Sequence, residues 1–341
     1  MKYTFIESIL VKPHLETSGD YALTLKNKGV DVSFWNVGFN LGWNDWEMPK
    51  FLDHIGYGTR RRWQIFSKVI NDQGINTFTF DEMQTDDNFY GQSKSWAENF
   101  SGNLAELKDY HFAGVPLGLA VASSLISYAK DSSPKLCDYK EQLNGLLFSS
   151  ALVFLRTNYI LARESPDAVV TFNWRFATSF PIFSASQEKG IKCYFHERGS
   201  NYKKYEIFDG FVHDFKYQKE RIVNAWDTSG SGRKRVSEKF FMDRRKGENQ
   251  GWYSFTKNQK VGVTPEFNKE KYRARLVYYS SSDDEYAAII PKNVSGPFLS
   301  QIDAFNCLME WVKKNEDVEL VVRVHPHLKD KSKAERLRWT F

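Results

Sequence analysis

The sequence has few cysteines, and nothing in their spacing indicates a covalent or metal framework. Only Cys137, Cys193 and Cys307 occur, they are widely spaced, and none belongs to a CxxC pair. This excludes a disulfide scaffold and the usual cysteine-rich zinc sites, and it indicates a reducing compartment. The N-terminal segment also lacks the uninterrupted apolar run of a secretory signal, so we predict a cytoplasmic protein.

The sequence also lacks a long, purely apolar segment and a large excess of charge. Its longest apolar run, residues 112–129, is rich in Gly, Ala and Ser. This length is borderline for crossing a bilayer, so a buried helix is the better prediction. The formal net charge is only +5. Such a charge suits a small anionic ligand or contact with the cytoplasmic face of the inner membrane, and it argues against a nucleic-acid partner.

The composition is that of a chain that folds around a large core. Of its 341 residues, 41% are hydrophobic and 16% are aromatic. The length suits two domains, or one large domain and part of another. Most aromatic side chains are expected in the core, with a minority lining a cleft that binds a ligand.

The first part of the chain alternates strands with helices. Strand, helix and strand follow one another at the N-terminus, which predicts a parallel α/β sheet. Residues 39–100 are less regular, and the alternation then resumes. We predict an N-terminal Rossmann-like domain over residues 1–227. Its predicted elements are strand 4–11, helix 18–29, strand 30–38, strand 75–80, helices 114–130 and 139–163, strand 167–173, helix 175–190 and strand 191–200.

The last part of the chain begins the same alternation again. Residues 228–273 are polar and basic, and they predict a linker or a helical flap. Residues 274–341 predict the start of a second Rossmann-like domain. A domain of this kind normally carries several more strands, so we expect the chain to end inside it. The predicted elements are strand 274–282, helix 298–315, strand 318–326 and helix 329–339.

Polar side chains follow four of the predicted strands, where an open α/β sheet binds its ligands. Each segment also has a purely structural explanation, such as a buried Asn beside a solvent-reaching Arg, a salt-bridged turn, a helix N-cap or an ordinary strand exit. Two segments lie in each predicted domain, as a cleft between two domains would require. The segments are FNWR at 172–175, HERGS at 196–200, SSSDDE at 280–285 and RVHPH at 323–327.

The RVHPH segment carries the most specific chemistry. Arg323 and His325 follow an apolar strand, and Pro326 restricts the backbone between His325 and His327. Guanidinium and imidazole groups donate strong, charge-assisted hydrogen bonds to phosphate oxygens. The segment therefore predicts a phosphate-binding site.

Three segments, taken in order, resemble those of bacterial capsule and lipopolysaccharide glycosyltransferases of the GT-B type, which have two Rossmann-like domains. LVYYSSSDDEYAA and LVVRVHPHLKDKS are similar to the C-terminal domain of the capsule polysaccharide biosynthesis proteins, which are related to the Kdo transferases. TFNWRFATSFPIFSASQEKGIKCYFHERGS is similar to the end of their N-terminal, acceptor-side domain. The resemblance covers residues 167–333. It implies an α/β, GT-B-like fold that is cut short in its second domain.

The resemblance also implies a reaction. A sugar would move from a nucleotide-sugar donor to a growing surface glycan or a lipid-linked glycan acceptor, without a cofactor. The family's later Ser/Thr-rich turn and acidic residue have no counterpart in this sequence, which puts the catalytic competence of this chain in doubt. No Asp-X-Asp pair stands at a predicted strand end, so we predict no metal. The residues implied at the donor phosphate and the donor pocket are Arg323, His325, Pro326, Ser280, Ser281 and Ser282.

The acceptor would need a general base, which we expect at Glu197 or, next, at His196, because both leave the N-terminal sheet where an acceptor should lie. Asp45 and Asp53 are outside candidates from the irregular region. Arg60, Arg61 and Arg62 are better explained as a solvated surface run, although an anionic glycan or a lipid phosphate would suit them. The residues predicted to hold an anionic acceptor or a donor carboxylate are Asn173, Arg175, Arg198 and Ser200.

Other functions fit the same sequence. Glycerophosphotransferases of the CDP-glycerol type share the fold and a similar His-Pro segment, and nucleotide-sugar epimerases share the two-domain plan. From a different class, the chain would be a non-catalytic glycan-binding partner of a surface-polysaccharide assembly machine. Binding of nucleotides separates the enzymes from that partner.

Overall fold

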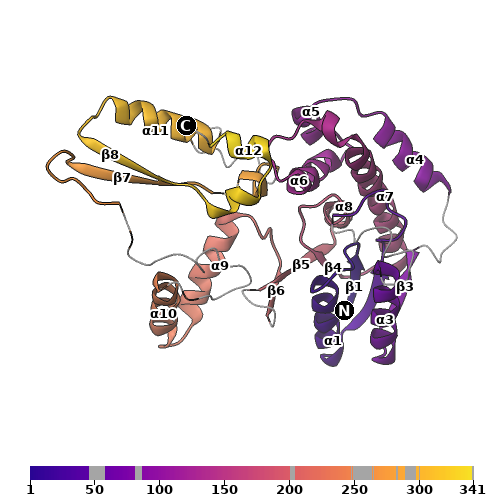
Figure 1. Cartoon of the computed structure of the whole chain (residues 1–341). Helices are drawn as coiled ribbons and strands as arrows, with labels where there is room; N and C mark the ends of the chain where they lie inside the picture. Colours follow the sequence, from indigo (N-terminus) through magenta and orange to yellow (C-terminus); the bar gives the residue numbers. More distant parts are fainter. Residues whose placement is uncertain are drawn as a thin grey trace. The chain divides into compact units, whose positions relative to one another are not determined.

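A computed structural model describes residues 1–45, 58–80, 87–199, 204–246, 248, 263, 265–281, 283–288, 297–298 and 300–339. Its contacts divide the chain into two compact units (Figure 1). Unit 1 comprises Met1–Leu125 and Lys135–Gly230, and unit 2 comprises Ile126–Pro134 and Ser231–Phe341. The sequence analysis places the first boundary after residue 227. It also places residues 126–134 in the first domain, whereas the contacts group them with unit 2.

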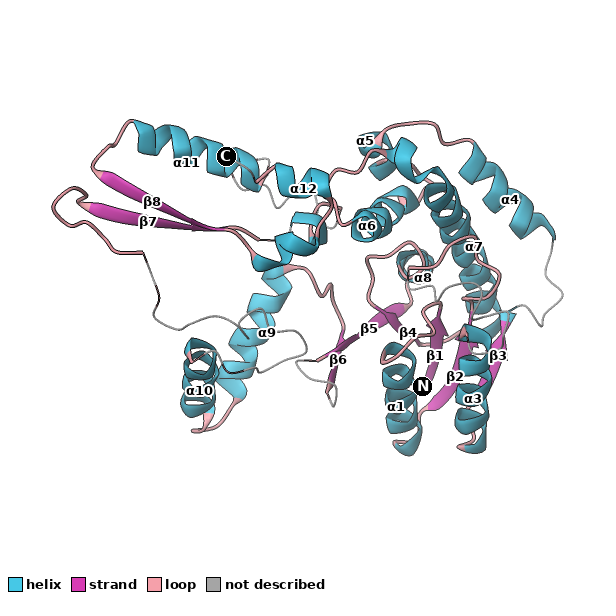
Figure 2. Ribbon diagram, in the orientation of Figure 1, coloured by secondary structure: helices cyan, strands magenta, loops and turns pink. Residues whose placement is uncertain are grey.

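Unit 1 is built on a six-stranded sheet in the order β3-β2-β1-β4-β5-β6 (Figure 2). Neighbouring strands run parallel from β3 through β5, and β6 pairs antiparallel with β5. This mostly parallel α/β sheet is compatible with Rossmann-like folds. The strands are β1 (Lys2–Glu7), β2 (Asp31–Asn36), β3 (Asn76–Thr79), β4 (Ala168–Phe172), β5 (Lys192–Arg198) and β6 (Tyr205–Phe208).

The order of the strands locates the topological switch point of the sheet. The chain winds outward from β1 through β2 to β3, and it then returns to the other side of β1 to form β4 and β5. All five residues of β4 are buried, as are the last five of β1, because a central parallel strand has both faces covered. Ligands of open α/β sheets bind at the carboxyl ends of the strands that flank the switch point, which here are β1 and β4.

One face of the sheet is covered by α1 (His14–Asn27) and α3 (Thr59–Asp72), which lie side by side in Figures 1 and 2. Alternate strand residues point to this face, as the two-residue period of a strand requires. They pack with residues from both helices into one core cluster. Its fully or largely buried members include Phe5, Leu15, Ala22, Val32, Phe34, Trp63, Ile70, Ala168 and Val170.

The long helix α7 (Lys140–Glu164) packs against α4 (Asp87–Glu98) and α8 (Phe180–Glu188). Within the described residues, Leu136–Glu164 is the one stretch that is long and apolar enough to cross a membrane, and 67% of its most apolar window is buried inside the structure. Core helices of soluble proteins pass the same test. The apolar run at 112–129 forms α6 (Leu117–Ala129), in which Val121 and Leu125 are fully buried.

Several elements of unit 1 differ from the sequence-based expectation. Helix α8 begins at Phe180 and not at residue 175, because Asn173 adopts a φ of 24° and its side chain accepts a hydrogen bond from the Arg175 amide. Strand β6 was not predicted. The irregular region at 39–100 contains α3, α4 and β3. The remaining described helices of unit 1 are α5 (Leu104–Lys108), the 3-10 helix η2 (Leu136–Tyr139) and α9 (Phe215–Thr228).

Unit 2 contains a parallel pair of strands, β7 (Ala274–Tyr279) and β8 (Val318–Arg323), connected through α11 (Gln301–Lys313). The rings of Tyr278, Phe305 and Trp339 pack together, and Phe305 is 1% exposed. This is one βαβ unit, as the sequence predicts. Its other described helices are α10 (Arg233–Arg245), η3 (Asp283–Glu285), η4 (Pro326–Asp330) and α12 (Lys333–Leu337).

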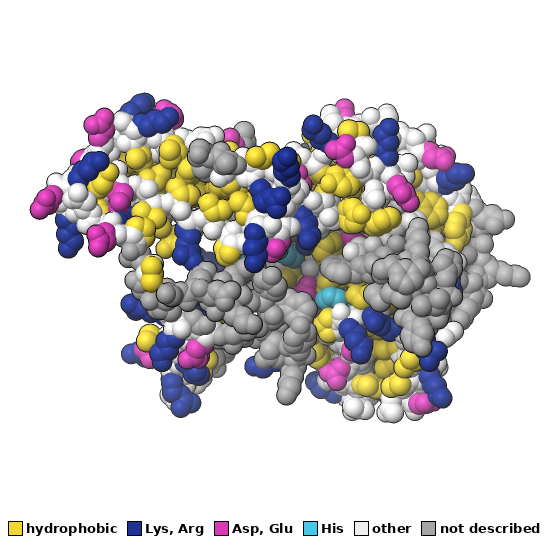
Figure 3. All heavy atoms as spheres, in the orientation of Figure 1, with side chains coloured by type: hydrophobic (Ala, Val, Ile, Leu, Met, Phe, Trp, Pro, Cys, Tyr) yellow, Lys and Arg dark blue, Asp and Glu magenta, His cyan; other side chains and the backbone are white. Residues whose placement is uncertain are grey.

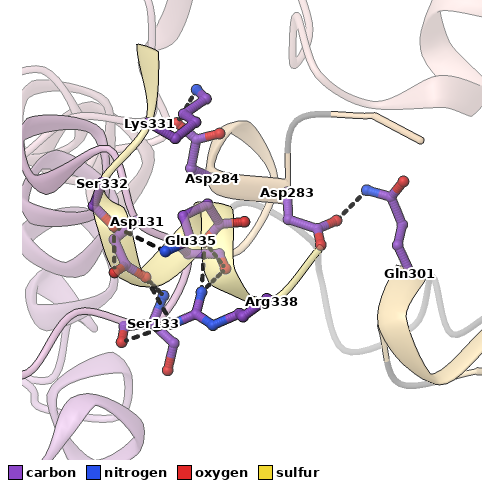
Figure 4. Close-up of polar contacts among 10 residues, drawn as sticks. Asp131, Ser133, Asp283, Asp284, Gln301, Lys331, Ser332, Glu335 and Arg338 are labelled. Atoms are coloured by element: carbon purple, nitrogen blue, oxygen red, sulfur yellow. Dashed lines mark hydrogen bonds and ion pairs between the residues drawn. The ribbon is translucent and has the colours of Figure 1, made fainter. Parts of the chain in front are cut away.

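A polar network fastens α12 to residues 130–133 within unit 2 (Figure 4). Arg338 bridges Asp131 and Glu335, with 2.9 Å between its Nη2 and Oδ1 of Asp131. The Ser132 amide and hydroxyl both donate to Oε2 of Glu335, at 2.9 and 2.8 Å. Because Asp131 and Glu335 are 5% and 4% exposed, these contacts satisfy carboxylates that are costly to bury alone. They explain why residues 126–134 belong to unit 2.

Replacing Ser332 with alanine is expected to destabilise unit 2 by about 1–2 kcal/mol. Ser332 is the N-cap of α12, where its Oγ accepts from the Glu335 amide at 3.0 Å and donates to Oδ2 of Asp131 at 2.9 Å. Ser300→Ala is the comparison, because Ser300 caps α11 in the same way but donates to the carboxylate of Asp303, within its own helix, at 2.9 Å. Urea unfolding of both variants measures the difference. Equal losses would show that the long-range bond to Asp131 contributes no more than the local bond of Ser300 to Asp303.

Candidate functional site

The carboxyl ends of β7 and β8 bring two of the predicted segments together. Tyr279 pairs with Arg323 in the parallel register, and the Ser280 amide donates to the Arg323 carbonyl at 3.2 Å. One step further along, the His325 amide donates to Oγ of Ser280 at 2.8 Å. The serine segment and the His-Pro segment therefore form one local structure. Ser281 is exposed beside it, and Ser282 lies outside the described residues.

The backbone around Pro326 orients the His325 ring. His325 caps η4, and its Nδ1 accepts from the His327 amide at 3.2 Å. In a neutral ring this acceptor role assigns the hydrogen to Nε2, which makes Nε2 the nitrogen that can donate to a ligand. His325 and Pro326 are part-buried, and Arg323 is exposed. The strand end thus presents a guanidinium and an oriented imidazole at the surface of unit 2.

Asp283 and Asp284 of the SSSDDE segment serve the fold of unit 2 (Figure 4). Asp284 forms a buried ion pair with Lys331, with 2.6 Å between Oδ2 and Nζ. Asp283 accepts from the Gln301 side chain, and burial raises the pKa of its carboxyl. The Gln301 side chain in turn accepts from the Ser281 amide at 2.6 Å. These contacts hold the loop after β7 in place.

In unit 1, the predicted residues Asn173, Arg175 and Glu197 meet at the carboxyl ends of β4 and β5. The Asn173 side chain donates from Nδ2 to Oε2 of Glu197 at 2.9 Å, and its Oδ1 accepts from the Arg175 amide at 3.2 Å. The other Glu197 oxygen accepts from the Arg198 amide at 2.9 Å. This arrangement fixes the Glu197 carboxylate beside the switch point.

Asp45 is more closely integrated into this edge of the sheet than its rank in the sequence analysis suggests. The hydroxyl of Thr178 donates to Oδ2 of Asp45 at 3.1 Å, and the Thr178 carbonyl accepts from the hydroxyl of Ser8, which directly follows β1. Asp45 is part-buried. Burial of the carboxyl raises the pKa of Asp45 to about 6, against the opposing effects of hydrogen bonds from Ser124 and Thr178 and of the Arg175 charge.

Arg175 is the cation of this cluster. Its Nη1 donates to the Ser123 hydroxyl at 3.2 Å, and its guanidinium lies 4.1 Å from the centre of the Phe176 ring. The same charge acts on His213, whose pKa is lowered to about 4 by burial and by Arg175. The Arg175 charge therefore acts on both Asp45 and His213. Sequence reasoning missed His213, because no motif connects it with the strand ends.

His196 does not lie where a general base for an acceptor should lie. Its side chain is fully buried, and its Nε2 is 2.7 Å from Oε1 of Glu7. The Ser18 hydroxyl donates to the same Glu7 oxygen at 2.6 Å. This corrects the expectation for His196, which occupies a buried polar cluster under α1. Glu7 was missed, although a single acid in the apolar strand TFIESILV is the signal that points to it.

The other predicted anion-binding residues have separate locations. Arg198 is part-buried. Burial, with smaller effects of His196 and of the Arg198 charge, lowers the pKa of His14 to about 3. Arg60 donates from Nη2 to Asn40 Oδ1 at 2.7 Å. Ser200 and Asp53 lie outside the described residues. In the described part of the chain, no group of three or more His, Cys, Asp and Glu side chains is placed to hold a metal ion.

The surface drawn in Figure 3 carries charges of both signs. Lys and Arg side chains are spread across this face and are interspersed with Asp and Glu side chains. They do not gather there into one basic stripe of the kind that follows a nucleic-acid backbone. Comparison of the chain with models of known protein families, and with curated proteins, gave no match to either.

Proposed function

We propose that the protein is a glycosyltransferase of GT-B type that transfers a sugar from a nucleotide-sugar donor to a surface glycan. The observation that carries the proposal is the contact between Ser280 and His325 at the adjacent ends of two parallel strands. Carboxyl ends of parallel strands are where α/β proteins bind nucleotides. Two segments 45 residues apart meet there, as the resemblance to capsule glycosyltransferases implies.

Unit 2 would bind the donor. His325 donates from Nε2 to an oxygen of the donor phosphate, and Arg323 supplies a second, charged donor. Together they stabilise the negative charge that develops on the phosphate when the bond to the sugar breaks. The hydroxyl of Ser280 fixes the backbone of His325 at the end of β8, because it accepts a 2.8 Å hydrogen bond from the His325 amide. This arrangement needs no metal for the departure of the nucleotide.

Unit 1 would activate the acceptor. Asp45 is the favoured base, because a carboxyl with a pKa of about 6 is ionised at neutral pH and still basic enough to take a proton. Asp45 removes the proton from an acceptor hydroxyl, and the hydroxyl oxygen attacks the anomeric carbon. The bonding electrons of the old glycosidic bond leave with the nucleotide. Glu197, fixed by Asn173, is the second candidate, and Arg175 would hold an anionic group of the acceptor.

A thermal-shift screen of the full chain tests the proposal. CMP-, UDP-, GDP- and CDP-linked sugars and CDP-glycerol are added at equal concentrations. A donor at 100 times its Kd stabilises the native state by about 2.7 kcal/mol, which is a readily measured rise in melting temperature. Stabilisation by one sugar nucleotide supports glycosyl transfer. Stabilisation by CDP-glycerol alone would replace it with glycerophosphate transfer, and no response to any nucleotide would favour a non-catalytic glycan-binding partner.

A further inference from the structure

A groove in unit 1 lies beside the first turn of α1 and one side of α3, apart from the residues proposed for catalysis. It encloses about 460 Å³. Its lining combines cationic and apolar side chains, which is unusual for a surface that serves only solubility. The lining residues are Lys12, Leu15, Glu16, Gly58, Arg61, Arg62, Ile65, Phe66 and Val69.

The spacing of the α3 residues explains the two-part character of the groove. Arg62, Ile65, Phe66 and Val69 follow one another at intervals of three, one and three residues, so they form one stripe along the helix. The stripe is cationic at its start and apolar along the rest. Trp63 and Ile70 point instead into the core, where they are 4% and 2% exposed.

Two of the three apolar residues of the stripe are exposed to solvent, and Phe66 between them is partly buried against the core. Ile65 is 58% exposed and Val69 is 53% exposed, whereas Leu15 on the facing helix is 1% exposed and supplies an apolar floor. Covering these side chains with a hydrocarbon would remove apolar surface from water, which is favourable in proportion to the area removed.

Among the lining residues of the groove, cationic side chains outnumber acidic ones. Lys12, Arg61 and Arg62 line it together with Glu16, whose carboxylate lies 4.0 Å from the Lys12 ammonium group. Arginine side chains bind phosphate in planar, bidentate geometry. Charge complementarity therefore selects an anionic head group, and the apolar stripe selects a chain attached to it.

We propose that this groove binds an anionic amphiphile, a lipid phosphate whose head group contacts Arg61 and Arg62 and whose hydrocarbon follows Ile65, Phe66 and Val69. The inference rests on the proposed function in one respect, because it identifies the acceptor as lipid-linked. The His14 side chain, adjacent in sequence to the groove residue Leu15, contacts the end of β4. The centres of the His14 and Phe172 rings are 4.0 Å apart, and Phe172 directly precedes Asn173.

Calorimetric titration of the full chain with monomeric dodecyl phosphate tests the inference. Two comparison ligands separate the features of dodecyl phosphate. Inorganic phosphate carries the charge of the head group without the hydrocarbon chain, and dodecyl maltoside carries the chain without the charge. We expect both to bind at least about tenfold more weakly than dodecyl phosphate, because each engages only half of the groove. Equal binding of inorganic phosphate would reduce the site to a phosphate site, and equal binding of dodecyl maltoside would remove the role of charge. Either result overturns the inference.

Two substitutions locate the binding. Arg62→Glu and Val69→Asp are each expected to weaken the binding of dodecyl phosphate about tenfold or more. Their matched controls, Arg244→Glu and Val236→Asp, make the same changes at exposed positions of α10 in unit 2, and they should leave the affinity unchanged. Val236 is 65% exposed and Val69 is 53% exposed, so neither change disturbs a core.

The outcome is separable from that of the proposed function. If both groove variants bind dodecyl phosphate with full affinity, or if the α10 controls lose as much affinity as the groove variants do, the proposed binding site is wrong. The nucleotide screen is unaffected by these variants, because its ligand contacts unit 2. If the groove variants lose dodecyl phosphate binding but no nucleotide stabilises the protein, the lipid-phosphate site is supported and the proposed sugar transfer is contradicted.

Discussion

Asp45→Asn is expected to lower the rate of sugar transfer by about 10²- to 10⁴-fold and, at the same time, to stabilise the folded protein at pH 7.5. The rate falls because asparagine cannot take a proton from the acceptor hydroxyl. The stability rises because the pKa of Asp45 is about 6 in the folded chain, above its ordinary 3.8, so ionising the carboxyl at pH 7.5 destabilises the folded state. Asparagine carries no charge and avoids this cost.

The pH dependence of the stabilisation is specific. The wild-type protein loses the contribution of Asp45 as the pH rises from about 4 through about 6, and asparagine removes this loss. We expect Asp45→Asn to match the wild type near pH 4 and to exceed it by about 1–3 kcal/mol above pH 6.5. Thermal unfolding between pH 4 and pH 8, with a transfer assay at pH 7.5, measures both effects. Unchanged transfer would exclude Asp45 as the base, and Glu197→Gln would then be the next substitution to assay.

Glu7→Ala is expected to destabilise unit 1 by about 3 kcal/mol or more. The change removes the partner of Nε2 of His196 and of the Ser18 hydroxyl, all of which are shielded from water, and it leaves a cavity. Unsatisfied buried polar groups cost about 1–3 kcal/mol each, and cavities add to that cost. Native-state hydrogen exchange of the amides of β1 and β5 reports the loss locally, which matters because a chain of two units need not unfold in one step.

Glu7→Gln is the control for the same position. Glutamine keeps an oxygen in place of Oε1 and fills the same volume, so we expect it to lose less than half as much stability as alanine. If alanine and glutamine behave alike, or if neither changes the exchange of β1 and β5, the buried Glu7–His196 contact does not stabilise these two strands.

The sequence predicts the parallel core of unit 1 well, because its strands are buried on both faces and appear as continuous apolar runs. β2, β3, β4 and β5 fall within the predicted ranges, whereas β1 begins at Lys2, before the predicted start at residue 4. β6 is a four-residue edge strand whose segment, YEIF, is too short for a period to be distinguished. The late start of α8 depends on the left-handed backbone of Asn173, which no local pattern announces.

The sequence predicted which residues of the candidate site lie together only where the order of the strands brings them together. Two parallel strands end side by side, so the meeting of the Ser280 and His325 segments follows from a βαβ unit. The roles of His196 and Glu197 do not follow in this way. Neighbouring residues of a strand point to opposite faces, so the two side chains could not both serve one acceptor. The partner of His196 is 189 residues away in the sequence, and only the folded sheet reveals it.

The assignment of residues 126–134 to unit 2 has the same physical origin. Asp131 and Ser132 look like ordinary loop residues after a helix. Their partners Ser332 and Glu335 are 201 and 203 residues further along the chain. Contacts over such distances depend on the fold as a whole, and no motif in either segment points to the other.

The most direct test of the account is a calorimetric titration of wild-type and His325→Ala protein with the nucleotide sugar that the screen selects. Loss of a charge-assisted hydrogen bond to phosphate is expected to weaken binding by about tenfold or more. His111→Ala, which removes an exposed histidine from unit 1, should bind as the wild type does. Equal affinities of His325→Ala and the wild type would contradict the claim that the end of β8 holds the donor phosphate.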